Sequence, residues 1–257
     1  MIKKLLLSFC LILLVLRGSA QNQALEFDGV DDKVVVPNNA AFNSTTAVTV
    51  EAWIYANSWK AQQWQGTIIG HDGANSSGYT LRCGANGRLS FVVGDGGWSE
   101  VASGPVMQAQ TWNHVAGVID NGKIFIYING SVVDSANVSN TPVATTANLQ
   151  IGESPGFSGR VFDGAIDEVR VWNVARTESE IKANKSVDLP ATEPGLVAYY
   201  KFDQTTGTTT PNTITTTNTL GTLVNFGSTP WVAGYVEASV DLSASALISP
   251  DIIKLYS

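Results

Sequence analysis

The chain is dominated by short segments in which apolar and polar residues alternate. Residues 48–55 show the pattern most clearly, because Val48, Val50, Ala52 and Ile54 alternate with Thr49, Glu51, Trp53 and Tyr55. Successive side chains of a strand point to opposite faces, so a period of two predicts a strand with one buried face. Comparable short runs occur at 25–27, 33–36, 88–93 and 123–128. The pattern predicts an all-β protein.

The turns between these runs predict antiparallel pairing. Asn-Gly dipeptides stand at 86–87, 121–122 and 129–130. Asn-Gly favours positive φ, whose twist matches that of a hairpin, so each dipeptide indicates a chain reversal. Since strands and helices do not alternate along the sequence, a parallel sheet is not expected. We therefore expect an antiparallel β-sandwich of jelly-roll type.

One short helix is expected between Thr177 and Lys185. Thr177 and Glu180 have the spacing of a capping box, and Ile181 supplies an apolar contact. We interpret this helix as a connector between strands.

The two ends of the chain differ from the middle. Lys3 and Lys4 precede an apolar run that ends in the small residues 18–20, which predicts a signal peptide over residues 1–20 and a secreted protein. Acylation of Cys10 is the less favoured alternative, because a bulky residue precedes it and the apolar run continues past it. No later segment has the roughly 20 apolar residues of a membrane span. We expect the sandwich to occupy residues 21–236 and a linker or tail to occupy residues 237–257.

Composition narrows the possible partners. The formal net charge is −7, and loss of the signal segment removes three further positive charges. Nucleic acid and anionic membranes are poor partners for such a surface, whereas neutral glycans carry no charge penalty. Cys83, the only cysteine after the signal segment, lies in a strand-like run and is expected to be a small buried hydrophobe.

Five motifs in fixed order resemble a known family. They are Ala24–Val34, Val50–Ile54, Thr111–Ala116, Ile126–Gly130 and Gly164–Asn173. The chain from 24 to 176 resembles the laminin-G-like jelly-roll modules of the concanavalin A-like lectin/glucanase superfamily, in the form common in exported bacterial proteins. The resemblance implies a non-catalytic recognition module that binds an extracellular polysaccharide or surface glycan.

The segment after the expected helix has two interpretations. Residues 195–202 resemble a segment that often begins a module of this family, but here the segment comes late in the chain. It either starts a second, incomplete module or completes the first sandwich. We favour completion, because residues 220–225 add only one more strand-like run. Residues 205–219 are mostly Thr, Asn, Gly and Pro and are expected to form an exposed loop.

The resemblance also implies a calcium ion, which many members of the family bind. Asp28 and Asp167 are the main candidate ligands, with Asp31 and Asp32 as weaker ones. Calcium takes six to eight oxygen ligands, which carboxylates in loops can supply. The alternative is that Asp28 caps a turn and that Asp167 pairs with a basic residue such as Arg170.

Tryptophans in polar loops are the candidate carbohydrate-binding residues. Sugar rings present flat C–H faces, and exposed aromatic rings with nearby hydrogen-bonding groups suit them. The candidates are Trp59, Trp64 and Trp98, assisted by Gln62, Asn75 and Asp95. The alternative is that these rings fold back and cover one end of the sandwich.

Two other functions compete with glycan recognition. One is a structural or adhesive module that binds protein, which dispersed or buried tryptophans would favour. The other is a glycoside hydrolase, because enzymes of the superfamily use a Glu-x-Asp-x-x-Glu strand with two carboxylates beside the scissile bond. The closest sequence here, residues 167–170, lacks the paired glutamates, so we expect no enzymatic activity.

Overall fold

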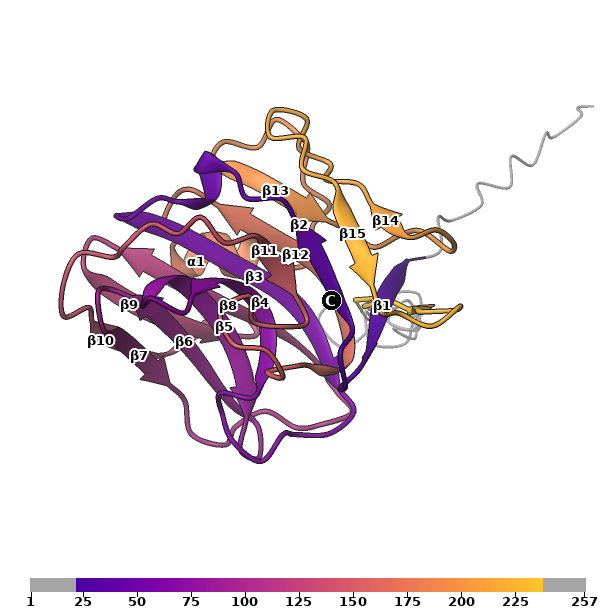
Figure 1. Cartoon of the computed structure of the whole chain (residues 1–257), viewed down its shortest axis with the longest axis horizontal. Helices are drawn as coiled ribbons and strands as arrows, with labels where there is room; N and C mark the ends of the chain where they lie inside the picture. The colour runs from indigo at the N-terminus through magenta and orange to yellow at the C-terminus, as the bar shows by residue number, and fades with distance from the viewer. Residues whose placement is uncertain (1–21, 238–257) are drawn as a thin grey trace, which may run out of the picture.

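The computed structural model describes residues 22–237. The predicted signal peptide and all but the first residue of the predicted tail lie outside this range. Within it, two antiparallel sheets pack face to face as a sandwich, which confirms the predicted fold class (Figure 1).

The first sheet, sheet A, has eight strands among the described residues. Its order is β10 (Ser131–Asn137), β9 (Lys123–Ile128), β8 (Trp112–Asp120), β3 (Ala47–Ala56), β12 (Asp163–Trp172), β1 (Gln23–Asp28) and β16 (Trp231–Ala233), and β13 (Leu196–Tyr200) also pairs with β12. The motifs that carry the family resemblance lie largely in this sheet.

The second sheet, sheet B, also has eight strands within residues 22–237. Its order is β14 (Thr209–Thr210), β15 (Gly221–Val224), β2 (Lys33–Val36), β11 (Leu149–Ile151), β4 (Gly66–Gly73), β5 (Ser77–Gly84), β6 (Arg88–Gly94) and β7 (Trp98–Ala102). A single turn of 3₁₀ helix, Ala40–Phe42, leads from β2 to β3.

One short helix covers part of the outer face of sheet A. Helix α1 (Glu178–Asn184) has the predicted capping box, since the Thr177 side chain accepts from the Glu180 N–H and the Glu180 side chain reaches back to the Thr177 N–H. Its one buried residue, Ile181, packs against Ala116, Val118 and Tyr127 on the outer face of sheet A. The helix therefore covers part of that face, in addition to the connecting role inferred from the sequence.

The strands after α1 extend both existing sheets. β13 pairs with β12, β15 pairs with β2 and β16 pairs with β1. The expected exposed loop at 205–219 is only partly exposed. The Asn212 side chain accepts from the Tyr199 N–H at 2.9 Å, and Ile214 is buried beside Trp172 and Tyr199. The late segment therefore contributes core residues.

The core between the sheets is tightly packed at the centre. Gly117 in β8 faces Phe91 in β6, and a Cβ placed at position 117 would lie 2.4 Å from a carbon of that ring. Phe91 is fully buried, so it has little room to move. A side chain at position 117 would therefore separate the two sheets locally.

Replacing Gly117 by Ala should destabilise the protein by about 1–3 kcal/mol, because an added methyl overpacks a filled core. Urea denaturation measures the change. The matched control is Gly227→Ala, since a Cβ there meets nothing within 4 Å. The control should leave stability unchanged or slightly raised. Equal stability of the two variants would contradict this packing.

Candidate functional site

A pocket lies on the face of sheet B that is turned away from the core. The alternation in β5 explains why polar groups line it, because Tyr79, Leu81 and Cys83 enter the core whereas Thr80 and Arg82 point outward. The pocket has a volume of about 230 Å³. Its lining residues are Trp64, Asp72, Thr80, Arg82, Val92, Trp98, Glu100, Phe157 and Arg160.

Three aromatic rings and one guanidinium form the walls. Trp64 and Trp98 are each 40% exposed and come from different segments, the loop before β4 and the first position of β7. The Trp98 and Phe157 ring centroids are 6.0 Å apart. The Arg160 guanidinium carbon lies 4.0 Å from the centroid of Phe157 and 5.0 Å from that of Trp64. Arg160 and Phe157 thus connect the two tryptophans across the pocket.

The loop that carries Trp64 is fixed to the neighbouring β5–β6 turn. The Gln65 N–H donates to the Gln62 carbonyl at 3.1 Å, and the Ala85 N–H donates to the Lys60 carbonyl at 2.8 Å. Gly84 permits the close approach, since a Cβ there would lie 2.1 Å from the Gln62 carbonyl oxygen. Backbone contacts therefore hold the loop that carries Trp64.

The opposite wall is anchored by side chains. The Ser154 hydroxyl donates to Asp72 at 2.8 Å and accepts from the Phe157 N–H at 3.1 Å. Glu153 accepts from the Gly159 N–H at 2.9 Å and forms an ion pair with Lys33. These bonds hold the loop that presents Phe157 and Arg160.

The floor of the pocket carries charged groups. Arg82 donates to Ser90 at 3.0 Å and to Glu100 at 3.0 Å, and Gln63 donates to the same Glu100 oxygen at 3.0 Å. Asp72 is 2% exposed, and one of its oxygens has no hydrogen-bond partner. Burial raises the pKa of Asp72, and hydrogen bonds from Ser154 and Thr80 oppose the rise. The pocket thus combines flat apolar walls with polar groups that can donate and accept.

The other candidate carbohydrate-binding residues lie outside this pocket. Trp59 is partly buried against the main core. Gln62 is exposed in the loop that carries Trp64, and Asn75 accepts from the Ser77 hydroxyl in the β4–β5 connection. Asp95 is buried and accepts from Ser99 and from the Asn140 N–H. The structure therefore brings together Trp64 and Trp98 but not the remaining four residues.

Asp95 has a local structural role. Burial would raise the pKa of its carboxyl, but hydrogen bonds from Ser99 and from the N–H groups of Asn140, Gly97 and Ser139 outweigh burial and lower it. Its oxygens tie the β6–β7 turn to the segment after β10.

Three of the four candidate calcium ligands form one cluster. One carboxylate oxygen from each of Asp28, Asp31 and Asp32 lies within 4.8 Å of the others. Asp28 also accepts from the Val30 N–H at 2.8 Å, which is the turn-capping contact considered as the alternative. Asp32 accepts from the Asp28 N–H, while its other oxygen is buried without a partner. Burial and the charges of Asp28 and Asp31 raise the pKa of Asp32.

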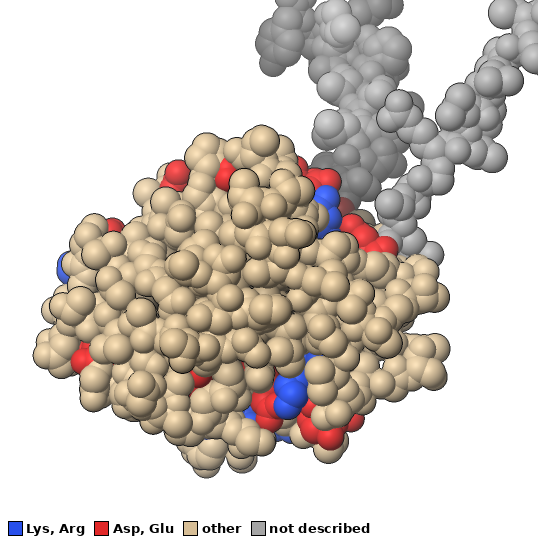
Figure 2. Space-filling model, turned by 45° about the horizontal axis from the view of Figure 1, so that its top comes forward, with Lys and Arg blue, Asp and Glu red and all other residues tan. Residues whose placement is uncertain are grey.

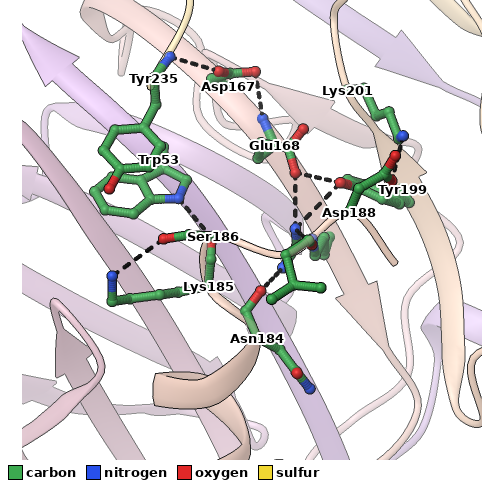
Figure 3. Close-up of polar contacts among 12 residues, drawn as sticks. Trp53, Asp167, Glu168, Asn184, Lys185, Ser186, Asp188, Tyr199, Lys201 and Tyr235 are labelled. Atoms are coloured by element: carbon green, nitrogen blue, oxygen red, sulfur yellow. Dashed lines mark hydrogen bonds and ion pairs between the residues drawn. The ribbon is translucent and has the colours of Figure 1, made fainter. Parts of the chain in front are cut away.

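Asp167 lies elsewhere, on the outer face of sheet A (Figure 3). Its carboxyl accepts from the N–H groups of Tyr235 and Glu168, at 2.9 Å and 2.8 Å. The Tyr235 ring in turn stacks on Trp53, with centroids 3.4 Å apart. Asp167 therefore holds the segment after β16 against the sheet.

The ion pair considered between Asp167 and Arg170 is not formed. Arg170 instead lies 2.8 Å from Glu168 and 3.7 Å from Glu51, and it donates to the Asn184 carbonyl. The register of β12 against β3 shifts between Asp167 and Arg170, and Glu168 has φ of 52°. This irregularity places Glu168, and not Asp167, beside the guanidinium.

Glu51 completes the buried network around Arg170. It lies 3.2 Å from His114 and accepts from the Trp172 indole N–H at 2.9 Å. Burial would raise the pKa of Glu51, but the contacts with His114, Arg170 and Trp172 outweigh it and lower the pKa to about 2. The network is covered by the α1 segment and joins β3, β8 and β12.

Comparison with known proteins places this architecture in a family. The family model described as the concanavalin A-like lectin/glucanases superfamily, Laminin_G_3, matches residues 28–182, which is more than half of the chain. The chain belongs to this laminin-G-like family. The match confirms the resemblance inferred from the five motifs. The sequence has no significant match among curated proteins.

Solved structures with the same laminin-G-like fold include binding modules. A Bacteroides ovatus protein to which carbohydrate binding is ascribed aligns with a TM-score of 0.65 and 26% identity, over 84% of this chain and 60% of that one. The chain thus spans about 60% of that protein's length.

Two solved structures with lower sequence identity share the laminin-G-like fold, and the likeness to them concerns the fold only. Domain 4 of AbnA, an extracellular arabinanase of Geobacillus stearothermophilus solved with arabinotriose, aligns with a TM-score of 0.51 and 21% identity, over 62% of this chain and 75% of that one. The CBM40 of a Ruminococcus gnavus IT-sialidase, bound to α2,3-sialyllactose, aligns with a TM-score of 0.50 and 16% identity, over 65% of this chain and 98% of that one.

The face of the molecule in Figure 2 carries few charged residues, in keeping with a chain in which 14% of residues are charged. Among residues 22–237, no helix combines the length and the apolar character needed to cross a bilayer.

Sequence reasoning missed seven lining residues: Asp72, Thr80, Arg82, Val92, Glu100, Phe157 and Arg160. The alternation in β5 could have placed Arg82 on the outer face, because it follows the core residue Leu81. The position of Glu100 near Arg82 depends on the registers of β5 against β6 and of β6 against β7, which single residues do not reveal. Phe157 and Arg160 lie in a loop whose sequence carries no periodic signal.

The stability of the protein should fall as pH rises because of Asp167. Burial raises its pKa to about 8, and repulsion by Glu168 contributes, whereas hydrogen bonds from Tyr235 and Glu168 oppose the rise. An unfolded aspartate titrates near pH 3.9. Between about pH 4 and pH 8 the folded state therefore holds a proton that the unfolded state lacks, and raising the pH through this range favours unfolding.

Asp167→Asn tests this dependence, because an amide does not titrate. The free energy of unfolding, measured by urea denaturation at several pH values, should shift in favour of the variant as pH rises through this range. Parallel profiles for the variant and the wild type would show that Asp167 does not carry the effect.

Proposed function

We propose that the protein is an exported, non-catalytic recognition module that binds a glycan in the pocket on sheet B. One observation carries the proposal: Trp64 and Trp98, exposed and from separate segments, flank one pocket with a polar floor. The Bacteroides ovatus relative supports it, because carbohydrate binding is ascribed to that protein.

The chemistry of the pocket suits a sugar. The indole faces offer flat apolar surfaces for the C–H faces of a sugar ring, while Arg82, Glu100 and Asp72 offer donors and acceptors for hydroxyls. Pockets for drug-sized ligands measure roughly 300–1,000 Å³. At about 230 Å³ this pocket suits one sugar residue, with the rest of a polysaccharide lying outside.

The carboxylates of the pocket are poorly arranged for hydrolysis. Asp72 is on β4 and Glu100 is on β7, three strands away in the sheet. Their backbones are thus separated by roughly 14 Å of sheet, since neighbouring strands lie about 4.8 Å apart. Glycosidases need two carboxyl groups beside the scissile bond, free to exchange a proton or attack the sugar. Glu100 is also paired with Arg82. This arrangement supports binding without catalysis.

Convergence of the tryptophans also favours glycan recognition over a protein-binding or adhesive function. Trp64 and Trp98 share one small concave site, whereas a protein partner needs a far larger surface, about 800 Å² on each side.

Trp64→Ala and Trp98→Ala should each weaken binding about tenfold or more, since losing a buried aromatic contact costs roughly 1.4 kcal/mol or above. Titration calorimetry against soluble polysaccharides measures the affinity, and thermal melting checks folding. Trp112→Ala is the control, because Trp112 is a half-buried indole on sheet A. Equal affinity of wild type and both pocket variants for a bound glycan would contradict the proposed site.

We also propose that the cluster of Asp28, Asp31 and Asp32 binds calcium. Three carboxylates at short range repel one another, and a divalent cation would relieve that repulsion. The buried, unpartnered oxygen of Asp32 fits such a ligand set. We leave Asp167 out, because it lies outside the cluster and its raised pKa favours the neutral acid near pH 7.

Calcium should raise the melting temperature relative to the protein in a chelator, because an ion that binds only the folded state stabilises it. The increase should be lost in Asp31→Asn, whose exposed side chain can be changed with little effect on packing. Identical melting temperatures of the wild type in calcium and in a chelator would rule the site out.

A further inference from the structure

Arg160 is unusual among the arginines of residues 22–237. Arg82, Arg88, Arg170 and Arg176 each form an ion pair or a side-chain hydrogen bond. The Arg160 side chain forms neither within the part of the chain that the structure describes, and its contacts are the Phe157 and Trp64 rings. A charged group in the wall of a pocket is thus left without an anionic partner.

The stacking leaves its hydrogen-bond donors free. A guanidinium over an aromatic ring uses its flat face, while its N–H groups point outward in its own plane. Two of these N–H groups match the two oxygens of a carboxylate. Phe157 and Trp64 therefore hold the Arg160 side chain in the pocket wall, while its N–H groups form no hydrogen bond within residues 22–237.

The charges around Arg160 do not neutralise it. Arg82 is paired with Glu100 at 3.0 Å, so this pair contributes little net charge. Asp72 attracts Arg160, but the two form no ion pair, and Asp72 is bonded to Ser154. Burial and the nearby Arg82 lower the pKa of Arg160, and the attraction of Asp72 opposes this. Two guanidiniums and two carboxylates thus line the pocket, and of these four groups Arg160 is the one that forms no ion pair or hydrogen bond within residues 22–237.

We propose that the pocket selects an acidic glycan, with the carboxylate of a uronic or sialic acid residue bound by the N–H groups of Arg160 while the sugar ring lies between Trp64 and Trp98. This inference rests on the proposed function of the same pocket. The overall negative charge favoured a neutral glycan as the ligand, whereas the environment of Arg160 favours a carboxylated one.

Two matched pairs of probes test this selectivity. They are trigalacturonate with its carboxyl-reduced counterpart, and sialyllactose with lactose. Calorimetry with the mature chain, in a chelator and at about 0.15 M salt, should show at least tenfold tighter binding of one acid than of its neutral match.

Variants identify the residue responsible. Arg160→Gln should reduce the preference for the acid to less than about twofold, whereas Arg160→Lys should retain part of it because the charge remains without the planar donors. Arg88→Gln is the control, since Arg88 does not line the pocket and donates to the Ser103 carbonyl. It should bind as the wild type does.

The outcomes separate this inference from the proposed function. Equal binding of acid and neutral partner by the wild type, or an acid preference that survives in Arg160→Gln, would overturn the acidic-glycan inference. Sensitivity to Trp64→Ala in the same titrations would still support the pocket. Failure of both acids to bind would also overturn the inference, and binding of a neutral polysaccharide would then keep the proposed function.

Discussion

The alternation of side chains across sheet B is the constraint on which the rest of the structure depends. Along β5, the residues that enter the core fix those that face outward, because a shift of one position would exchange the two sets. Leu81 is fully buried between the sheets, and its neighbours Thr80 and Arg82 consequently line the pocket. The burial of core residues such as Leu81, which stabilises the sandwich, thus also determines which side chains line the pocket on the outer face.

The two outer faces of the sandwich have different roles. On sheet A, helix α1 and the following segment cover a polar network in which Glu51, His114 and Arg170 are almost fully buried. On sheet B, loops border the strands without closing over them, and they present Trp64 and Phe157 at the edge of an open pocket. The covered face stabilises the fold, and the open face is available to a ligand.

The fold could be predicted from sequence to a large extent, but the site only in part. Alternation and Asn-Gly turns are local signals, and so is the capping box at Thr177, so strands and helix were accessible. The sequence pointed to Trp64 and Trp98 because both lie in polar segments, where a large apolar ring needs another side chain or a ligand to pack against. Their meeting at one pocket depends on the order β4-β5-β6-β7, which the preferences of single residues do not reveal.

Long-range contacts explain the other differences. Asp95 looked available in a glycine-rich turn, yet Asn140 donates to it from a distant segment. Residues 205–219 looked unable to order themselves, yet Asn212 and Ile214 pack against Tyr199. Arg160 gave no signal at all, because its importance depends on two rings from different loops.

Resolved indole N–H signals in a two-dimensional NMR spectrum give the most direct test of where a glycan binds. During titration with a bound glycan, the signals of Trp64 and Trp98 should shift in a saturable manner, while those of Trp53 and Trp172, on the opposite sheet, stay in place. Shifts confined to the tryptophans of sheet A, with Trp64 and Trp98 unmoved, would contradict the account.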